Sequence, residues 1–440
     1  MRVGKVDLEG EGVRMTQDGP LDLVGVGFGP SNLALAVAIA EHNAAVAEHD
    51  ANTSARLRAR FVERQAEFGW HRGMLLEDAT MQVSFLKDLV TLRNPASEYG
   101  FLSYLHDHDR LVDFINYGSA FPTRLEFHDY LEWVARRFAG DVDYGTEVTG
   151  VDPVPGAPDL LDVVTTRGRL RTRNVVLATG LTPQLPDGVV PGERIWHSRD
   201  LLHRIDRIVD PERVIVVGAG QSAAEAVEHL HRRFERAQVW AVFHRYGYSP
   251  ADDTSFANRV FDPAAVDEFF TAPAEVKRMI LGYHANTNYS VVDPELIESL
   301  YRRHYHEKVS GRERLRFLNV SRVTEAVAAG DHVKVAVESL LDGTREALTA
   351  DLVVYATGYR PSDPCALLGE LAGSCRRDEA GRLVIDRDYR VATNPEVRAG
   401  IYVQGATEHT HGLSSTLLSN IAVRSGEIVE SIVARAGATV

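Results

Sequence analysis

The chain has 440 residues, of which 44% are hydrophobic and 25% are charged, and its formal net charge is −14. This length exceeds the size at which a single hydrophobic core stops growing, so two or more domains are expected. The negative charge argues against a nucleic-acid partner, and no stretch reaches the roughly 18 apolar residues of a membrane span. The composition is that of a globular protein with no nucleic acid and no membrane as its partner.

Residues 1–20 are polar, and we expect them to form a flexible leader. The leader has charges where a secretory signal has its apolar region, which favours the cytoplasm. Cys365 and Cys375 are the only cysteines, too few for a disulfide framework and not spaced as a Cys-x-x-Cys pair. Thiol redox catalysis is therefore not expected.

The predicted elements alternate between strands and helices, which is typical of α/β folds. A buried strand at 21–27 leads into a helix that starts near residue 31, and the next strand covers 61–63. Strands at 174–180 and 351–358 both end in Ala-Thr-Gly. They bracket a second unit with a strand at 213–220, a helix at 222–234 and a strand at 238–245. The C-terminal strand, loop and helix should complete the first unit.

The first strand-to-helix junction carries a glycine pattern that is typical of dinucleotide binding. Gly27 and Gly29 occupy the positions that permit a tight turn and a close approach of the pyrophosphate, and the helix begins beside Pro30. Asn32 stands where the third glycine is expected, which keeps a polar group near the phosphate. Glu63, at the end of the next strand, can accept hydrogen bonds from ribose hydroxyls. These residues predict the first nucleotide site.

A second junction repeats the pattern. Gly218 and Gly220 fill the two glycine positions, Gln221 and Ser222 follow, and alanine takes the third position. The returning strand ends in Arg245 without an acid, and an arginine can pair with the 2′-phosphate of NADPH. Two nucleotide sites imply internal hydride transfer, so we assign FAD to the first and NADPH to the second. The alternative is one working site and one decayed copy.

These motifs predict an α/β fold with two Rossmann-like dinucleotide-binding domains, the second inserted in the first. The expected FAD-binding domain covers residues 21–205 and 350–440, and the expected NADPH-binding domain covers 206–349. The electron acceptor is left open by the motifs, since oxygen, a quinone and an electron-transfer protein would all serve.

Five separated segments resemble, in family order, the flavin-dependent N-hydroxylating monooxygenases, which include ornithine N5- and lysine N6-hydroxylases. They are MQVSFLKDLVTLRNPASEYGFLSYL (81–105), DDTSFANRVFDP (252–263), NTNYSVVD (286–293), YATGYRP (355–361) and THGLSSTLLS (410–419). The resemblance implies hydroxylation of the side-chain amine of L-ornithine through a C4a-hydroperoxyflavin, with NADPH and O2, in siderophore or related natural-product biosynthesis. It also implies a homo-oligomer such as a tetramer. L-lysine or a diamine is the alternative substrate.

The resemblance also implies roles for individual residues. Gln82 resembles the glutamine beside the flavin ring, Lys87 the lysine that binds the amino-acid carboxylate, and Asn258 the asparagine that holds the backbone end of the substrate. Asn288 resembles the asparagine at the junction of flavin, nicotinamide and amine, and Ser419 a serine near flavin and substrate. Gln82 and Asn288 are thus the expected catalytic residues. The expected NADPH-binding domain includes a substrate-binding segment at about 250–310. Further cofactor contacts are implied for Gln221, Ser222, Arg245, Thr357 and Gly358.

Simpler interpretations exist for several of these residues. Lys87 could be a solvated lysine that pairs with Asp88, and Asn258 could cap a turn. His409 and His411 would share one face of a strand, but no third ligand cluster is evident, so no metal is expected. The alternative functions are a flavin reductase that serves a partner protein and a nucleotide-sensing module without catalysis.

Overall fold

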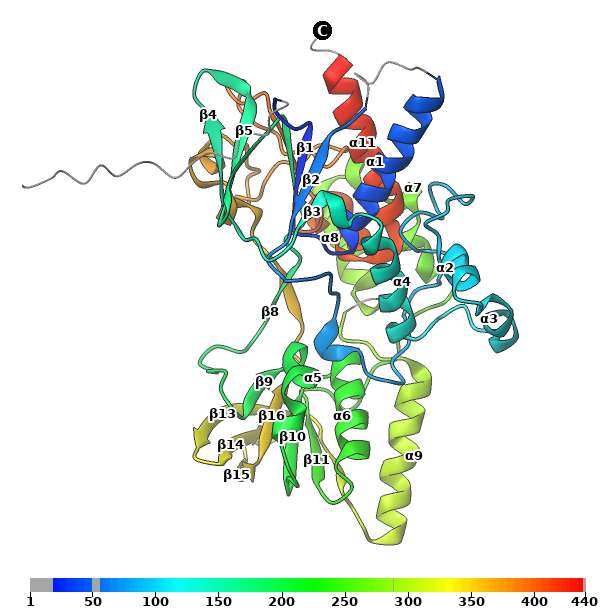
Figure 1. Cartoon of the computed structure of the whole chain (residues 1–440). Coiled ribbons are helices and arrows are strands. Elements are labelled where there is room, and N and C mark those ends of the chain that lie inside the picture. The colour runs from blue at the N-terminus through cyan, green and yellow to red at the C-terminus, as the bar shows by residue number, and fades with distance from the viewer. Residues whose placement is uncertain (1–18, 50–55, 288, 438–440) are drawn as a thin grey trace, which may run out of the picture.

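The computed structural model describes residues 19–49, 56–287 and 289–437 (Figure 1). Almost all of the expected leader, 1–20, and the candidate residue Asn288 therefore lie outside the described residues. Two parallel sheets dominate the described chain and form an upper and a lower unit in Figure 1, each with its own helices. This arrangement confirms the predicted α/β class with two Rossmann-like units.

The first sheet consists of five parallel strands, in the order β18 (Gly400–Val403), β7 (Asn174–Leu177), β1 (Leu23–Val26), β2 (Ala59–Val62) and β3 (Val142–Asp143). Helices α1 (Pro30–His49) and α11 (Ile421–Gly437) pack side by side against one face (Figure 1). An antiparallel sheet covers the other face. Because both faces are covered, every residue of β1, β7 and β18 is buried, as parallel sheets require.

The second sheet also has five parallel strands, in the order β12 (Leu315–Leu318), β11 (Gln238–Val242), β10 (Arg213–Val217), β16 (Leu352–Tyr355) and β9 (Ile195–His197). Helix α6 (Gln221–Arg233) follows β10 and packs beside α9 (Pro294–Ser310). The short helix α5 (Leu201–Arg204) precedes β10 in sequence. All five strands lie between β7 and β18 in sequence. The second unit is therefore inserted in the first, as predicted.

Two strands lie in a different unit from the one that the expected boundaries imply. Boundaries at residues 205 and 350 assign β9 and β16 to the first domain, yet both strands pair in the second sheet, with Val353 opposite Ile195 and Leu352 opposite Val214. A short apolar strand indicates burial but not the sheet that it joins. The chain crosses between the units at β8 (Leu181–Pro183) and β17 (Tyr359–Pro361), which pair antiparallel with each other (Figure 1).

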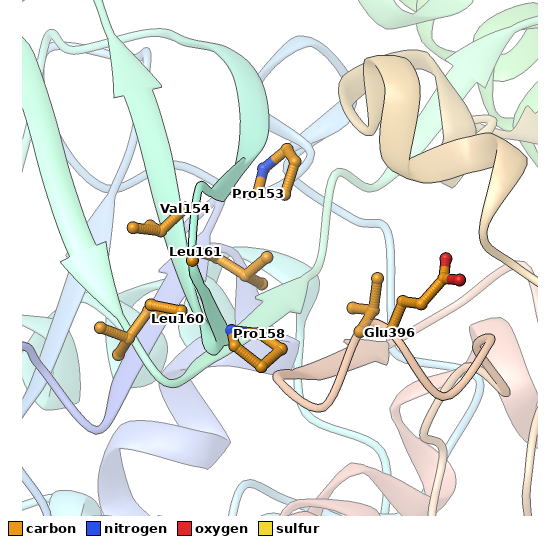
Figure 2. A pocket seen from close by; sticks show the side chains of 9 residues that line it. Pro153, Val154, Pro158, Leu160, Leu161 and Glu396 are labelled. Carbon is orange, nitrogen blue, oxygen red and sulfur yellow. The ribbon is translucent and has the colours of Figure 1, made fainter.

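Two antiparallel sheets flank the parallel ones and were not predicted. The first unit carries β4 (Val148–Val154), β5 (Ala157–Thr165) and β6 (Gly168–Thr172), and the second carries β13 (Ser321–Ala329), β14 (His332–Ser339) and β15 (Arg345–Ala350). A hollow of about 140 Å³ lies at the tip of the β4–β5 hairpin, between Pro158 and the loop of Glu396 (Figure 2). The described residues that line it include none of the predicted site residues.

The remaining helices place the predicted substrate segment against the first unit. Helices α2 (Phe101–Asp107), α3 (Leu111–Tyr117) and α4 (Arg124–Arg136) belong to that unit. Helices α7 (Pro263–Thr271) and α8 (Ala274–Tyr283) follow strands of the second sheet in sequence, but α7 packs on the short helix α10 (Glu408–His411) of the first unit. The chain then returns to the second unit in α9. None of the described helices is both long enough and apolar enough to cross a membrane.

Candidate functional site

The first glycine turn lies between β1 and α1. Gly27 has φ +82°, and a Cβ built there would lie 2.5 Å from the carbonyl oxygen of Ala178, which follows β7. Any other residue would therefore be strained and would collide with the backbone. A Cβ on Gly29 would meet no described atom within 4 Å, so the space beside this residue is open. Pro30 is the first residue of α1, where a missing N–H removes no helical hydrogen bond.

Asn32 ties the start of α1 to the end of β1. Its side chain is fully buried, and Nδ2 donates to the carbonyl oxygens of Gly27 at 2.7 Å and Val26 at 3.3 Å. Oδ1 accepts a hydrogen bond of 3.0 Å from Nε2 of Gln404, which follows β18. All three hydrogen bonds point into the protein. The side chain therefore shapes the turn through bonds within the protein, and its place near the phosphate stays a prediction.

Glu63 follows β2 and is bonded to the same turn. Its carboxylate is buried, with Oε2 accepting from the amide of Phe28 at 2.7 Å and Oε1 accepting from the amide of Gln65 at 2.8 Å. Each carboxylate oxygen has a further lone pair, so each can still accept a hydrogen bond from a hydroxyl. Glu63 thus fixes the glycine loop in addition to the ribose contact that the fingerprint predicts.

The second glycine turn repeats the geometry of the first. Gly218 has φ +143°, and a Cβ there would lie 2.3 Å from the carbonyl oxygen of Ala356, which follows β16. In each unit, the alanine of an Ala-Thr-Gly segment therefore packs against the first glycine of the turn. Ala223, in the third position, is fully buried, and a Cβ on Gly220 would lie 3.4 Å from Cα of Ser290. The repeated Ala-Thr-Gly is the sequence signal for this contact.

Thr357 and Gly358 lie where the chain leaves the second sheet for the first unit. The Thr357 hydroxyl donates to the carbonyl oxygen of Gln184. Gly358 has φ +84°, and its carbonyl oxygen is bonded to the amide of Gln184 at 3.0 Å and to Nε2 of His197 at 2.9 Å. These contacts brace the pairing of β8 with β17 beside the second turn.

The predicted NADPH residues surround the segment 289–293. Gln221 begins α6, and its Oε1 accepts a hydrogen bond of 2.8 Å from the amide of Asp293. Nη1 of Arg245 donates to the carbonyl oxygen of Ser290 at 2.8 Å. Ser222 is half-buried in the first turn of α6. The structure thus brings Gln221, Ser222 and Arg245 to one edge of the second sheet.

Lys87 is half-buried, and Nζ lies 5.9 Å from the ring centre of Phe261 in the short 3₁₀ helix η6 (Ala257–Phe261). The side chain of Asp88 is buried and does not pair with Lys87. Its carboxylate accepts hydrogen bonds from the amides of Val90, Thr91 and Phe101 instead. The local pair of Lys87 with Asp88, which the sequence left open, is not formed. Lys87 instead faces the segment that was predicted to bind substrate.

Asn258 lies in η6 with Phe261, and its Nδ2 donates to the carbonyl oxygen of Asp253 at 2.7 Å. This hydrogen bond agrees with the simpler interpretation, in which Asn258 caps a turn. η6 packs on η10 (Leu413–Thr416), which contacts η11 (Leu418–Asn420) and so leads to Ser419. Gln82 is exposed on the loop before Lys87. The elements that carry Lys87, Asn258 and Ser419 therefore converge, whereas no described contact joins Gln82 to them.

The C-terminal loop holds buried polar groups without a hydrogen-bond partner among the described residues. They are the hydroxyls of Thr407, Ser415 and Ser419 and the amide of Asn420, and the hydroxyl of Ser425 in α11 is a further one. A buried polar group without a partner costs about 1 to 3 kcal/mol. Natural structures rarely tolerate several such groups together, so this loop is suited to a bound polar group that supplies the missing donors and acceptors.

Arg424, in α11, connects this loop with the first turn and was missed by the sequence analysis. It is buried, and it donates to the carbonyl oxygen of Ser415 at 2.7 Å, to Oε1 of Gln404 at 3.2 Å and to Oγ of Ser31 at 3.3 Å. Burial lowers the pKa of Arg424. All three acceptors are neutral, so a buried cation lies behind the glycine turn. An arginine on the apolar face of the last helix is the signal that could have indicated it.

His409 and His411 lie in helix α10 and not on the strand that was expected. The ring of His411 stacks on Tyr389 with centres 4.1 Å apart, and its Nε2 is bonded to the carbonyl oxygen of Arg387 at 3.2 Å. Burial lowers the pKa of His411 to about 4. Within the part of the chain that the structure describes, no group of three or more His, Cys, Asp or Glu side chains could hold a metal ion.

Comparison with known proteins gives consistent relatives. The family model described as L-lysine 6-monooxygenase/L-ornithine 5-monooxygenase matches residues 19–361. The L-ornithine N(5)-monooxygenase of Burkholderia cepacia is 40% identical over 414 residues, which cover 90% of this chain and 91% of that protein. The ornithine N-hydroxylase of Kutzneria sp. 744, solved with reduced FAD, NADP+ and L-ornithine, has a TM-score of 0.90 at 49% identity. The match covers 95% of this chain and 100% of the hydroxylase chain. The L-lysine 6-monooxygenase of Pseudomonas syringae has a TM-score of 0.82 at 32% identity, with coverages of 94% and 99%.

Proposed function

The chain belongs to the L-lysine 6-monooxygenase/L-ornithine 5-monooxygenase family, and on this premise we propose that it hydroxylates the side-chain amine of L-ornithine with FAD, NADPH and O2. The product is N5-hydroxyornithine, which serves siderophore or related natural-product biosynthesis. The observation that carries the choice of ornithine is the higher identity to the ornithine N-hydroxylase, 49%, than to the lysine monooxygenase, 32%.

The first unit fits FAD. Gly27, Gly29 and Pro30 bring the amide donors of α1 to the diphosphate, and Asn32 holds that turn closed. Glu63 stands where the ribose is expected. The unpaired buried groups near Ser419 fit a polar ligand, and Gln82, on the loop before Lys87, is a further proposed contact of the flavin. When bound, FAD accepts hydride from NADPH and activates O2.

The second unit fits NADPH. The turn of Gly218 and Gly220 places the start of α6 toward the diphosphate. Arg245 offers a guanidinium to the 2′-phosphate, and the strand before it ends without an acid that would repel this group. NADPH should therefore reduce the flavin with a higher kcat/KM than NADH, and Arg245→Ala should narrow the difference. Equal kcat/KM values in the native protein would contradict this assignment. Further proposed contacts are Gln221, Ser222, Thr357 and Gly358.

We place the substrate against the first unit, where the elements that carry Lys87, Asn258 and Ser419 converge. Lys87 supplies the cation for the α-carboxylate of ornithine, and Asn258 the contact to its backbone end. Asn288 and Ser419 are the proposed contacts of the reacting amine. Only the neutral amine is nucleophilic, and a free alkylammonium has a pKa of about 10.4. The rate should therefore rise with pH unless the site itself disfavours the ammonium form.

A product assay tests the proposal. The purified protein with FAD and NADPH is supplied with L-ornithine, L-lysine, putrescine or cadaverine, and hydroxylamine formation and NADPH oxidation are measured together. We expect the highest kcat/KM for hydroxylamine formation with L-ornithine. A higher value with lysine or a diamine would support the alternative substrate. NADPH oxidation without hydroxylamine from any amine would support the flavin reductase, and no NADPH oxidation would support the nucleotide-sensing module.

We also propose a homo-oligomer, such as a tetramer, on the strength of the family resemblance. Light scattering coupled to gel filtration tests it, and a monomer at all concentrations would contradict it. Residence in the cytoplasm stays a prediction from the N-terminal sequence.

A further inference from the structure

A buried ion pair joins the two units beside the second glycine turn. Arg124, the first residue of α4 in the first unit, forms two hydrogen bonds with Glu225 of α6 in the second. Nη2 lies 2.8 Å from Oε1, and Nη1 lies 3.0 Å from Oε2. The two side chains are only 12% and 5% exposed. A bidentate arginine–carboxylate pair fixes direction as well as distance, so this contact restrains the orientation of one unit relative to the other.

On the side of the second unit, the ion pair continues into the second glycine turn. Oε1 of Glu225 also accepts a hydrogen bond of 3.0 Å from Nε2 of Gln221. Gln221 in turn accepts from the amide of Asp293 at 2.8 Å, at the end of the segment that receives Arg245. Glu225 therefore holds the first residue of α6 and, through it, the segment 289–293.

On the side of the first unit, the same arginine anchors the loop that carries Gln82. The amide of Arg124 donates to the carbonyl oxygen of Ala79 at 2.7 Å, and the amide of Met81 donates to that of Pro122 at 2.9 Å. The residues immediately before Gln82 are thus fastened to the start of α4. One buried pair consequently links the loop of Gln82 with Gln221.

We propose that Arg124 and Glu225 are positioning residues that set the orientation of the NADPH site relative to the FAD site. The proposal rests on the proposed function, because it assigns the pair a role in hydride transfer between the two nucleotides. The crossing at β8 and β17 is a two-stranded ribbon, which is weak on its own. Met74, Leu76 and Ala79 also pack in the core of the second unit, but apolar packing is not directional, so the buried ion pair is a contact that fixes direction. Removal of one partner leaves an uncompensated buried charge, whereas removal of both leaves none.

The test compares Glu225→Gln, Arg124→Gln and the double variant. Anaerobic stopped-flow measures flavin reduction by saturating NADPH, and calorimetry measures the Kd of NADP+. Each single variant should slow flavin reduction by about tenfold or more. The Kd of NADP+ should change by less than about threefold, because Glu225 in Arg124→Gln, or the amide oxygen of the new glutamine in Glu225→Gln, can still accept the hydrogen bond from Gln221. The double variant should lose no more than the worse single variant, since the two residues act as one unit.

A second measurement follows the contact between the units directly. Gly73 lies in the segment between the units, whose Met74 packs in the core of the second unit, and a Cβ on Gly73 would lie 1.6 Å from the Arg199 carbonyl oxygen. Hydrogen exchange followed by mass spectrometry should therefore show faster exchange at 72–82 and 198–204 in each single variant. This measurement needs neither NADPH nor turnover.

The matched control is Glu307→Gln, which breaks the buried pair of His231 with Glu307, 2.6 Å apart and confined to the second unit. It should lower the melting temperature while flavin reduction and exchange at 72–82 stay native. If a glutamine variant fails to fold, Arg124→Lys, which keeps the charge but loses the bidentate geometry, carries the same expectations.

Native rates of reduction and exchange in Glu225→Gln would overturn the proposal, and so would losses that multiply in the double variant. Failure of the proposed function would look different. The native protein itself would then not be reduced by NADPH, while hydrogen exchange would still decide whether the ion pair holds the units together.

Discussion

Nε2 of Gln404 donates a hydrogen bond of 3.0 Å to Oδ1 of Asn32, which joins the end of β18 to the first turn of α1. Asn32 meanwhile donates to the carbonyl oxygen of Gly27 at 2.7 Å. The third position of the fingerprint is therefore a buried junction between a strand, a turn and a helix. Glycine would bring the helix closer but could form none of these bonds.

Asn32→Ala should destabilise the FAD-free protein by about 2 kcal/mol, because buried groups that lose their partners cost about 1 to 3 kcal/mol. Urea denaturation measures the change, and a titration of flavin fluorescence should show weaker FAD binding. The control is Asn43→Ala on the same helix, whose hydrogen bonds run to Leu57, away from the turn. Equal FAD affinity in native protein and Asn32→Ala would contradict the role of this junction.

Arg424 should act on the cofactor more than on the fold. Arg424→Gln removes a buried charge that has only neutral acceptors, so the FAD-free protein should lose less than about 1 kcal/mol. The affinity for FAD should fall by about tenfold or more, because the diphosphate at the start of α1 loses a nearby cation.

Arg387→Gln is the matched control for Arg424. Arg387 forms ion pairs with Glu427 at 2.8 Å and Asp267 at 2.6 Å, so its loss leaves carboxylates unpaired. We expect this variant to lower the unfolding free energy while FAD affinity stays native. If Arg424→Gln lowered the unfolding free energy with native FAD affinity, while Arg387→Gln weakened FAD binding, the role of Arg424 in cofactor binding would be refuted.

Lys87→Ala should impair ornithine binding. A hydrogen bond to a charged group contributes about 1.5 to 3 kcal/mol, which corresponds to a rise in KM of roughly ten- to a hundredfold. Flavin reduction should stay native, since NADPH contacts its own unit, and electrons should be diverted to hydrogen peroxide. Putrescine has the amine but no carboxylate, so the KM for putrescine should be the same in Lys87→Ala and in the native protein. Unchanged KM and unchanged coupling with ornithine would make Lys87 an ordinary half-buried lysine.

His411 predicts a pH dependence of stability. Its pKa is about 4 in the folded protein and about 6.5 in the unfolded chain, so the unfolded state binds more protons between these values. The stabilisation from the neutral ring is complete above pH 6.5 and decreases as the pH falls toward 4. Between pH 7 and pH 5 the loss should be about 2 kcal/mol.

His411→Gln should remove this part of the pH dependence. Urea denaturation at pH 7 and pH 5 measures it in the native protein and the variant. If both lose the same free energy over this interval, His411 does not titrate as its burial requires.

Local patterns predicted the parts of the molecule that depend on neighbouring residues. It was possible to predict the glycines of both turns, the helices that follow them and the insertion of one unit in the other. Turn geometry and strand burial depend on residues that are close together in the sequence. The pairing of Lys87 with its neighbour Asp88, the alternative interpretation, is not formed, because the carboxylate of Asp88 accepts a hydrogen bond from the amide of Phe101.

Contacts between distant segments were not predictable. The membership of β9 and β16 in the second sheet, the ion pair of Arg124 with Glu225, and the hydrogen bond from Arg424 to Ser31 all depend on the tertiary fold. A single charged residue in a helix does not reveal its partner 100 or more residues away. The role of Asn288 stays a prediction, because this residue lies outside the described part of the chain.

The central claim is that one oxygen atom of O2 is placed on the side-chain nitrogen of L-ornithine. The most direct measurement supplies the purified protein with FAD, NADPH, L-ornithine and isotopically heavy O2, and determines the mass of the amino-acid product. We expect N5-hydroxyornithine that carries one heavy oxygen atom. Unmodified ornithine together with heavy hydrogen peroxide, or a hydroxylated product without the label, would contradict it.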